Sequence, residues 1–260
     1  MEPAGQAVAR YRGGDRGRPA LAIGVVLFLP SLAFGHISLA AWPYIGASAA
    51  LELIYFTLLA TAYRRAELSL VFPLARGFAP VLVLLIGLVA LHDHASAGEL
   101  AGVLLVAVGA TAVRGIRMAG GFADTGIALL IAVCIAGYTL VDKHGVSLAS
   151  PAAYLEAVMA LLVLPYLALV ARSRGLQALR RELRPRTAVI GIGIIGGYAL
   201  ALYGLRLAAA APVAAVRESS VVIGTALAAI VLRERVGPAR FCGACLVAAG
   251  VTVLAFAAGS

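Results

Sequence analysis

The sequence predicts an all-α fold, a polytopic bundle of about nine transmembrane helices in two inverted repeats. Three observations predict it: an apolar composition, a series of apolar runs of membrane-spanning length, and arginines concentrated in alternate loops. Of the 260 residues, 62% are hydrophobic and 13% are charged, and the mean hydropathy is +1.00. Soluble domains carry about 25% charged residues. The composition therefore excludes a soluble globular domain, a disordered chain and, despite a net charge of +9, a nucleic-acid-binding domain.

The apolar runs are predicted to be helices because about 20 apolar residues cross a bilayer and a helix bonds its own backbone polar groups. Barrel strands would be shorter and would alternate in polarity. Prolines within the runs do not exclude helices, since neighbouring helices re-satisfy the freed backbone groups. In chain order the predicted spans are 20–39, 42–63, 68–91, 99–113, 125–141, 151–171, 187–206, 209–232 and 239–257.

The arginines predict how these helices are oriented. Basic clusters fill the N-terminal segment and every second loop, and the other loops carry few basic residues. The positive-inside rule then places the N-terminus in the cytoplasm and the C-terminus outside. The clusters comprise Arg10, Arg12, Arg16 and Arg18, then Arg64 and Arg65, Arg114 and Arg117, Arg172, Arg174, Arg180, Arg181, Arg184 and Arg186, and finally Arg233, Arg235 and Arg240.

A shift of 141 positions aligns two parts of the chain without gaps. LHDHASAGELAGVLLVAVGATAV, from Leu91, lies over LRERVGPARFCGACLVAAGVTVL, from Leu232. The glycines of each copy are seven residues apart and share one helix face, which favours close helix packing. The predicted organisation is a basic segment at 1–19, a first repeat of four helices at 20–120 and a second of five at 121–260, in opposite orientations.

The two copies resemble the repeats of the EamA family in the drug/metabolite transporter (DMT) superfamily. RRAELSLVFPLARGFAPVLVLLIGL and the segment from Leu91 resemble the first repeat, and YGLRLAAAAPVAAVRESSVVIGTALAAIVLRERVGPARFCGACLVAAGVTVLAF resembles the second. The resemblance implies ten helices in two inverted five-helix repeats and export or exchange of small metabolites and drug-like compounds. Against this pattern the first helix is expected to be missing, either because the start of the sequence is mis-assigned or because the protein has nine helices; residues 7–18 resemble the end of that helix. Both termini are cytoplasmic in the family, opposite to the orientation that the charges indicate.

Ionisable residues within the predicted spans are candidates for a functional site, since charges at membrane depth face the bundle interior or a cavity. Arg76 and Arg217 occupy equivalent positions of the two repeats, and their guanidinium groups suit a carboxylate or phosphate. The glutamates are candidates for carrying a proton or binding an amine. In the alternative interpretation the charges pair with one another and only fix helix packing. The candidates for a substrate-binding cavity are Arg76, Arg217, Glu218, Ser219, Glu52 and Glu156.

Aromatic residues and prolines complete the set of predicted site residues. Tyr55, Tyr138 and Tyr198 are candidates for lining the cavity or anchoring helix ends. Pro73, Pro80 and Pro212 are candidates for bending helices during gating.

Two sequence patterns are interpreted as structural. The glycines of GIGIIG, from Gly191, match a dinucleotide-binding fingerprint, but they lie inside an apolar run with no preceding strand and indicate helix packing, with Gly193 and Gly197 as a close-contact pair. Cys242 and Cys245 lack a second pair of ligands for a metal. We therefore expect no catalytic residues, no metal and no cofactor.

The sequence thus favours a secondary transporter rather than an enzyme. It is expected in the cytoplasmic (inner) membrane as an exporter or exchanger of a small metabolite, working by alternating access between the two repeats. Its expected partners are the substrate, protons or a counter-substrate, and membrane lipid, but not nucleic acid. The alternative function is a non-transporting membrane scaffold or assembly protein.

Overall fold

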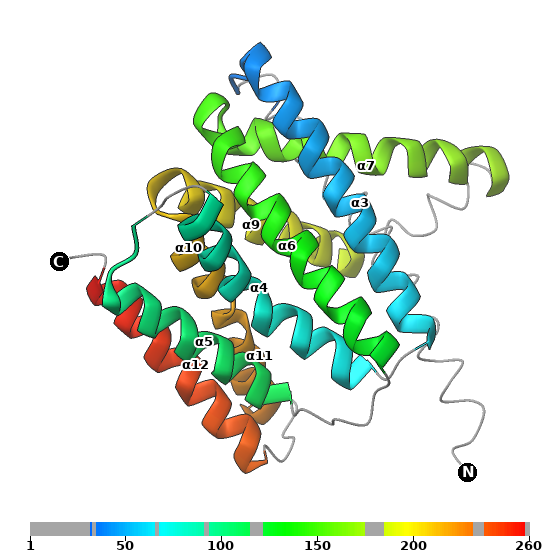
Figure 1. The fold of residues 1–260 in the computed structure, drawn as a ribbon. Helices are drawn as coiled ribbons and strands as arrows, with labels where there is room; N and C mark the ends of the chain where they lie inside the picture. Colours follow the sequence, from blue (N-terminus) through cyan, green and yellow to red (C-terminus); the bar gives the residue numbers. More distant parts are fainter. Residues whose placement is uncertain are drawn as a thin grey trace, which may run out of the picture. The chain divides into compact units, whose positions relative to one another are not determined.

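The computed structural model describes residues 32, 35–65, 68–90, 94–114, 122–174, 185–230 and 237–257. Within these ranges the chain forms α-helices and one short 3-10 helix, and its only β-pairing is an isolated bridge between Ile37 and Ala149 (Figure 1). The fold is therefore all-α, as predicted. The elements are η1 (Leu39–Ala41), α3 (Trp42–Arg65), α4 (Leu68–Ala90), α5 (Ala97–Arg114), α6 (Phe122–Leu148), α7 (Pro151–Arg174), α9 (Pro185–Leu207), α10 (Ala210–Arg217), α11 (Ser219–Ile230) and α12 (Pro238–Ala257).

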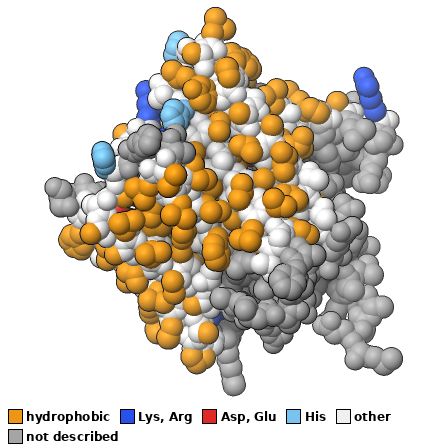
Figure 2. Space-filling model, in the orientation of Figure 1, with side chains coloured by type: hydrophobic (Ala, Val, Ile, Leu, Met, Phe, Trp, Pro, Cys, Tyr) orange, Lys and Arg blue, Asp and Glu red, His pale blue; other side chains and the backbone are white. Residues whose placement is uncertain are grey.

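The helices have the length and apolarity of membrane spans. Among the described residues, four stretches are long and apolar enough to cross a bilayer, namely Leu39–Ala62, Thr125–Leu148, Val189–Leu207 and Pro238–Ala257. Shorter apolar helices cover Ala75–Val89, Ala97–Ala112 and Pro151–Pro165. Hydrophobic side chains cover most of the described surface in the view of Figure 2. A surface of this kind is stable in lipid and not in water, so the chain is a multi-pass membrane protein.

The helix bounds follow the predicted spans, with two exceptions. The helix predicted at 125–141 is longer, since α6 continues to Leu148. The predicted span 209–232 is two helices, α10 and α11, which meet at Glu218. The Glu218 N–H donates to the carbonyl oxygen of Ala215, three residues earlier, at 3.0 Å. This tighter bonding ends α10, because an α-helix requires a partner four residues back. The predicted span 20–39 and the basic segment 1–19 lie almost entirely outside the described residues.

The described chain divides into two compact units. Unit 1 takes the described residues within 1–49 and 145–206, and unit 2 takes those within 50–144 and 207–260. Each unit therefore takes residues from both of the predicted repeats.

In unit 2, α5 and α12 lie side by side with their backbones in contact (Figure 1). A β-carbon built on Gly109 would lie 2.7 Å from the carbonyl oxygen of Gly243, and one built on Gly250 would lie 2.8 Å from that of Gly102. Real β-carbons do not approach backbone atoms so closely, so each position requires glycine. The predicted close approach at these glycines is confirmed.

The α5–α12 contacts are also related to each other by the 141-residue shift. Gly102 is equivalent to Gly243 under this shift, and Gly109 is equivalent to Gly250. The contact between Gly102 and Gly250 is therefore equivalent to the contact between Gly243 and Gly109. Such a reciprocal pair of contacts, in which each segment makes the same contact with the other, is characteristic of a two-fold axis. The α5–α12 interface of unit 2 therefore has the contact pattern of a pseudo-two-fold axis.

Unit 1 is held at the start of α7 by backbone and side-chain hydrogen bonds. The backbone N–H of Ser150 donates to the carbonyl oxygen of His36 at 2.8 Å, and the Ser150 Oγ accepts from the His36 N–H at 3.1 Å. Gly145 packs against the ring of the buried Tyr154, leaving no room for a β-carbon.

One packing prediction for α9 has no support among the described residues. GIGIIG does lie inside a helix, but a β-carbon on Gly193 or Gly197 would have no atom within 4 Å among the described residues. Small residues allow two helices to pack closely, but only where a second helix lies opposite them. The predicted close-contact pair is therefore absent from this part of the chain.

Candidate functional site

The candidate site of unit 2 is centred on an ion pair between α4 and the α10–α11 break. Arg76 Nη1 donates to Glu218 Oε1 at 3.3 Å. The side chains are 30% and 5% exposed, respectively. Arg76 lies within α4, which packs against α10, and Glu218 projects from the turn between α10 and α11. The break in the helix therefore coincides with the carboxylate that forms the pair.

A small cavity of about 20 Å³ adjoins this pair. A volume of this size holds about one water molecule. Three of its lining side chains are charged, with two guanidinium groups and one carboxylate. The lining residues are Tyr55, Arg76, Ala79, Pro80, Ile135, Tyr138, Thr139, Ala214, Arg217 and Glu218.

The second guanidinium of the cavity lies over an aromatic side chain. The Arg217 Cζ is 6.0 Å from the ring centroid of Tyr138, a distance at the outer limit of a cation–π contact. Tyr55 meets Tyr138 edge-on, with 6.2 Å between ring centroids. Two tyrosines from α3 and α6 thus form one wall of the cavity, beside the charged groups of α4 and α10.

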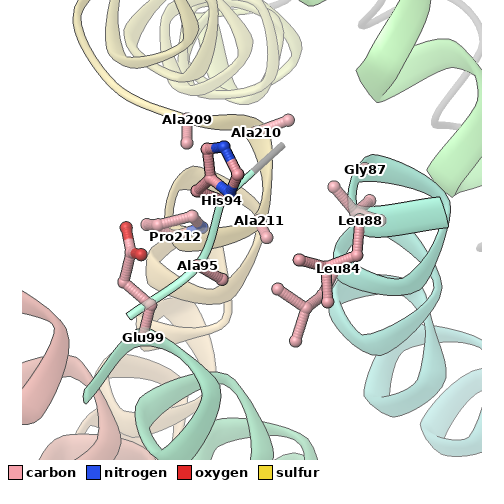
Figure 3. Close-up of a pocket in the computed structure, with 11 residues that line it drawn as sticks. Leu84, Gly87, Leu88, His94, Ala95, Glu99, Ala209, Ala210, Ala211 and Pro212 are labelled. Carbon is pink, nitrogen blue, oxygen red and sulfur yellow. The ribbon is translucent and has the colours of Figure 1, made fainter. Parts of the chain in front are cut away.

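A second cavity, also of about 20 Å³, lies between α4 and the start of α10. Figure 3 shows Leu84, Gly87 and Leu88 of α4 opposite Ala209 to Pro212, with His94 and Glu99 on the side of Pro212. Glu99 belongs to a capping box at the start of α5. Its Oε2 accepts from the Ser96 N–H at 2.9 Å, and its own N–H donates to the Ser96 Oγ at 3.2 Å. This arrangement satisfies two backbone donors and gives Glu99 a structural role.

The structure brings together six of the twelve residues predicted from sequence. Around the charged cavity lie Arg76, Arg217, Glu218, Tyr55, Tyr138 and Pro80. Ser219 and Glu52 belong to unit 2 but do not line the cavity. Glu52 is 2% exposed.

The remaining predicted residues lie elsewhere. Glu156 and Tyr198 belong to unit 1, so they are not part of this cavity. Pro212 lines the second cavity and lies in the first turn of α10, where a missing N–H breaks no helical bond. Pro73 lies in α4, but its side chain is outside the described residues.

Sequence reasoning missed the uncharged lining residues Ala79, Ile135, Thr139 and Ala214. The spacing of two of them was a usable signal. Ala79 follows Arg76 by three residues and Ala214 precedes Arg217 by three, which puts each on the same helix face as its arginine. Ile135 and Thr139 lie near Tyr138 on α6. They are uncharged, so the search for ionisable residues within the spans did not find them.

The sequence model described as the EamA-like transporter family matches residues 125–256. The chain belongs to the EamA-like transporter family. The family resemblance predicted from sequence is thereby confirmed, and the protein is a membrane transporter of the DMT type. The matched residues of this EamA-like chain begin within α6 and end within α12, and they carry Arg217 and Glu218 of the cavity.

A comparison with solved structures supports the fold. One crystal structure, described as "Crystal structure of protein", superposes with a TM-score of 0.65 at 18% sequence identity, covering 93% of the EamA-like chain and 86% of the other. Identity at this level shows a shared fold alone. No curated protein matches the chain.

Proposed function

We propose that the protein is a secondary transporter that exports or exchanges a small anionic or zwitterionic metabolite across the cytoplasmic membrane. In this proposal the substrate binds at the charged cavity of unit 2, and Arg217 and Glu218 are its principal contacts. Arg76 holds Glu218 in position, and Tyr55 and Tyr138 form the wall against which the substrate packs.

The proposal rests on one observation, the incomplete bonding of Glu218 beside the cavity. Oε1 of Glu218 accepts from Arg76, whereas the buried Oε2 has no hydrogen-bond partner among the described residues. A buried carboxylate oxygen without a partner costs about 1–3 kcal/mol or more. A donor group on a substrate, such as an ammonium or hydroxyl, would remove this cost.

The charges of the cavity favour an acidic group on the same substrate. Two guanidinium groups and one carboxylate line it, so one positive charge is in excess among the lining residues. Guanidinium binds a carboxylate or phosphate through paired hydrogen bonds. A compound with an acidic group near Arg217 and a donor near Glu218 fits this arrangement.

The size of the cavity implies a conformational change during transport. A volume of about 20 Å³ does not admit a metabolite. In the proposal the structure represents a closed state, and the cavity widens when substrate enters. The α10–α11 break at Glu218 could act as the hinge in the proposal, since discontinuous helices commonly form transporter binding sites. Alternating access between two inverted repeats is the mechanism that we propose for it.

The alternative function, a membrane scaffold, requires that the charges within the membrane be fully paired and that no cavity adjoin them. The Arg76–Glu218 pair meets the first requirement in part. The second is not met in the described chain, because a cavity lies beside the pair and the second oxygen of Glu218 has no hydrogen-bond partner. The transporter is therefore favoured.

Transport by the purified protein in proteoliposomes tests the proposal. The assay measures uptake of labelled dicarboxylates, amino acids and sugar phosphates, with and without a proton gradient and with and without unlabelled compound inside. We expect at least one compound to be taken up, with Arg217→Gln and Glu218→Gln reducing uptake at least about tenfold, the equivalent of about 1.4 kcal/mol. Ser220→Ala, at an exposed position two residues after Glu218, is the matched control and should transport normally. Uptake that is unchanged in both charge variants would refute the assignment of the site.

A further inference from the structure

Glu156 is a carboxyl group enclosed within unit 1. It lies in the second turn of α7, where every residue from Ala153 to Met159 is at most 6% exposed. Glu156 itself is 0% exposed. Two full turns of this helix are therefore buried on all sides, so the short glutamate side chain has no route to solvent along its own helix.

The enclosed carboxyl group has no partner in the described chain. Neither Oε1 nor Oε2 of Glu156 makes a hydrogen bond to any described residue. No ion pair among the described residues includes Glu156. The neighbouring ionisable residue on α7, Tyr154, is itself fully buried against Gly145. No cation among the described residues therefore balances an ionised Glu156.

An ionised carboxylate is not stable in such a position. Removing a charge from water without a counter-charge or hydrogen bonds costs far more than neutralising it by protonation. Because no described group stabilises the ionised form, we expect Glu156 to hold a proton in this structure. It does not line the cavity at Arg76, so substrate binding does not account for it.

We infer that Glu156 is a proton-binding site that must be occupied before the transporter can close, which makes the transport rate depend on pH; this inference rests on the transport function proposed above. In the closed state the carboxyl group is neutral. When unit 1 opens to water, the O–H bond of Glu156 breaks, the proton passes to a water molecule and the carboxylate is solvated. Closure requires the reverse step, in which water delivers a proton and the O–H bond forms again.

The sign of the pH dependence follows from this cycle. Only the protonated form of Glu156 permits closure, so transport slows as pH rises. Above the pH at which the group titrates in the open state, the closing rate falls about tenfold for each pH unit. Glu156→Gln is neutral at every pH and removes this dependence.

Infrared spectroscopy of the full chain in liposomes tests proton binding directly, with the proton as the probe and no transported compound needed. The difference spectrum of wild type minus Glu156→Gln should contain the carbonyl stretch of a protonated carboxyl group at neutral pH and lose it at alkaline pH. The Glu156→Asp variant should retain a band that also titrates. Absence of the band in the wild type, or a band that persists at every pH, would overturn the inference.

Exchange of labelled for unlabelled compound, measured over a range of pH, tests the role of Glu156 in closure. With the compound found in the uptake assay, the wild type should exchange more slowly as pH rises. Glu156→Gln should exchange at a rate independent of pH. An unchanged pH profile in Glu156→Gln would overturn the inference. If the wild type transports no compound, the proposed function fails, while the infrared measurement still decides whether Glu156 binds a proton.

Discussion

Arg76 and Glu218, 142 residues apart in the chain, meet in an ion pair at 3.3 Å between α4 and the α10–α11 break. The pair connects equivalent regions of the two predicted repeats, since Arg76 aligns with Arg217, the residue before Glu218. Where the first copy has Gly77 within a continuous α4, the second has Glu218 and a broken helix. The site thus lies where the two copies differ.

The ion pair should contribute measurably to stability. Arg76→Ala and Glu218→Ala are each expected to destabilise the protein, and a double-mutant cycle in detergent should give a coupling energy of about 1–2 kcal/mol. The reason is that Glu218 is nearly buried and loses its charged partner in the single variant. A coupling energy indistinguishable from zero would show that the two charges act independently.

The glycines of the α5–α12 interface should not tolerate alanine. Gly109→Ala and Gly250→Ala each place a methyl group against backbone atoms, so we expect a loss of about 1–3 kcal/mol in the free energy of unfolding. Gly193→Ala is the matched control, because it lies within α9 with open space at the β-carbon. It should stabilise the protein by about 0.5–1 kcal/mol. Equal effects in α5 and α9 would contradict the close packing.

The aromatic ring of Tyr138 should matter more than its hydroxyl group. Tyr138→Phe keeps a ring near Arg217 and Tyr55, and we expect it to transport nearly as well as the wild type. Tyr138→Leu removes the ring and should raise the substrate KM about tenfold, given the strength of cation–π contacts at desolvated sites. The KM values for uptake provide the measurement, and an intact KM in Tyr138→Leu would exclude the tyrosine wall from binding.

The capping box at the start of α5 is predicted to stabilise without affecting transport. Ser96→Ala loses the acceptor for the Glu99 N–H and should cost about 1 kcal/mol in thermal unfolding. Uptake per folded molecule should remain at the wild-type level. A specific loss of transport would instead assign a functional role to the rim of the second cavity.

Most of the helices were predictable because the membrane requires long apolar runs, and hydropathy detects these directly. The glycine face of α5 and α12 was predictable as well, since a spacing of seven returns to one side of a helix. The same reasoning failed at Gly193 and Gly197, because spacing does not report whether another helix lies opposite.

The break at Glu218 and the choice of ion-pair partner could not be predicted. A single tightened turn leaves the hydropathy of 209–232 unchanged. The partner of Arg76 depends on tertiary packing, and the sequence left several glutamates as candidates. The sequence also could not distinguish the environments of the two glutamates. Glu218 lies beside the cavity and Glu156 is enclosed in unit 1, and only the folded structure shows this difference.

Access to the cavity from each side of the membrane tests the central claim most directly. In a variant with Cys134, Cys242 and Cys245 replaced, Ala214→Cys places a thiol on the cavity wall. His94→Cys, at an exposed position, provides a control that an impermeant maleimide should reach from one side only. In right-side-out and inside-out vesicles, we predict that Ala214→Cys reacts from both sides and that a transported compound changes the rates. Reaction from one side alone, or from neither, would contradict transport by alternating access through this cavity.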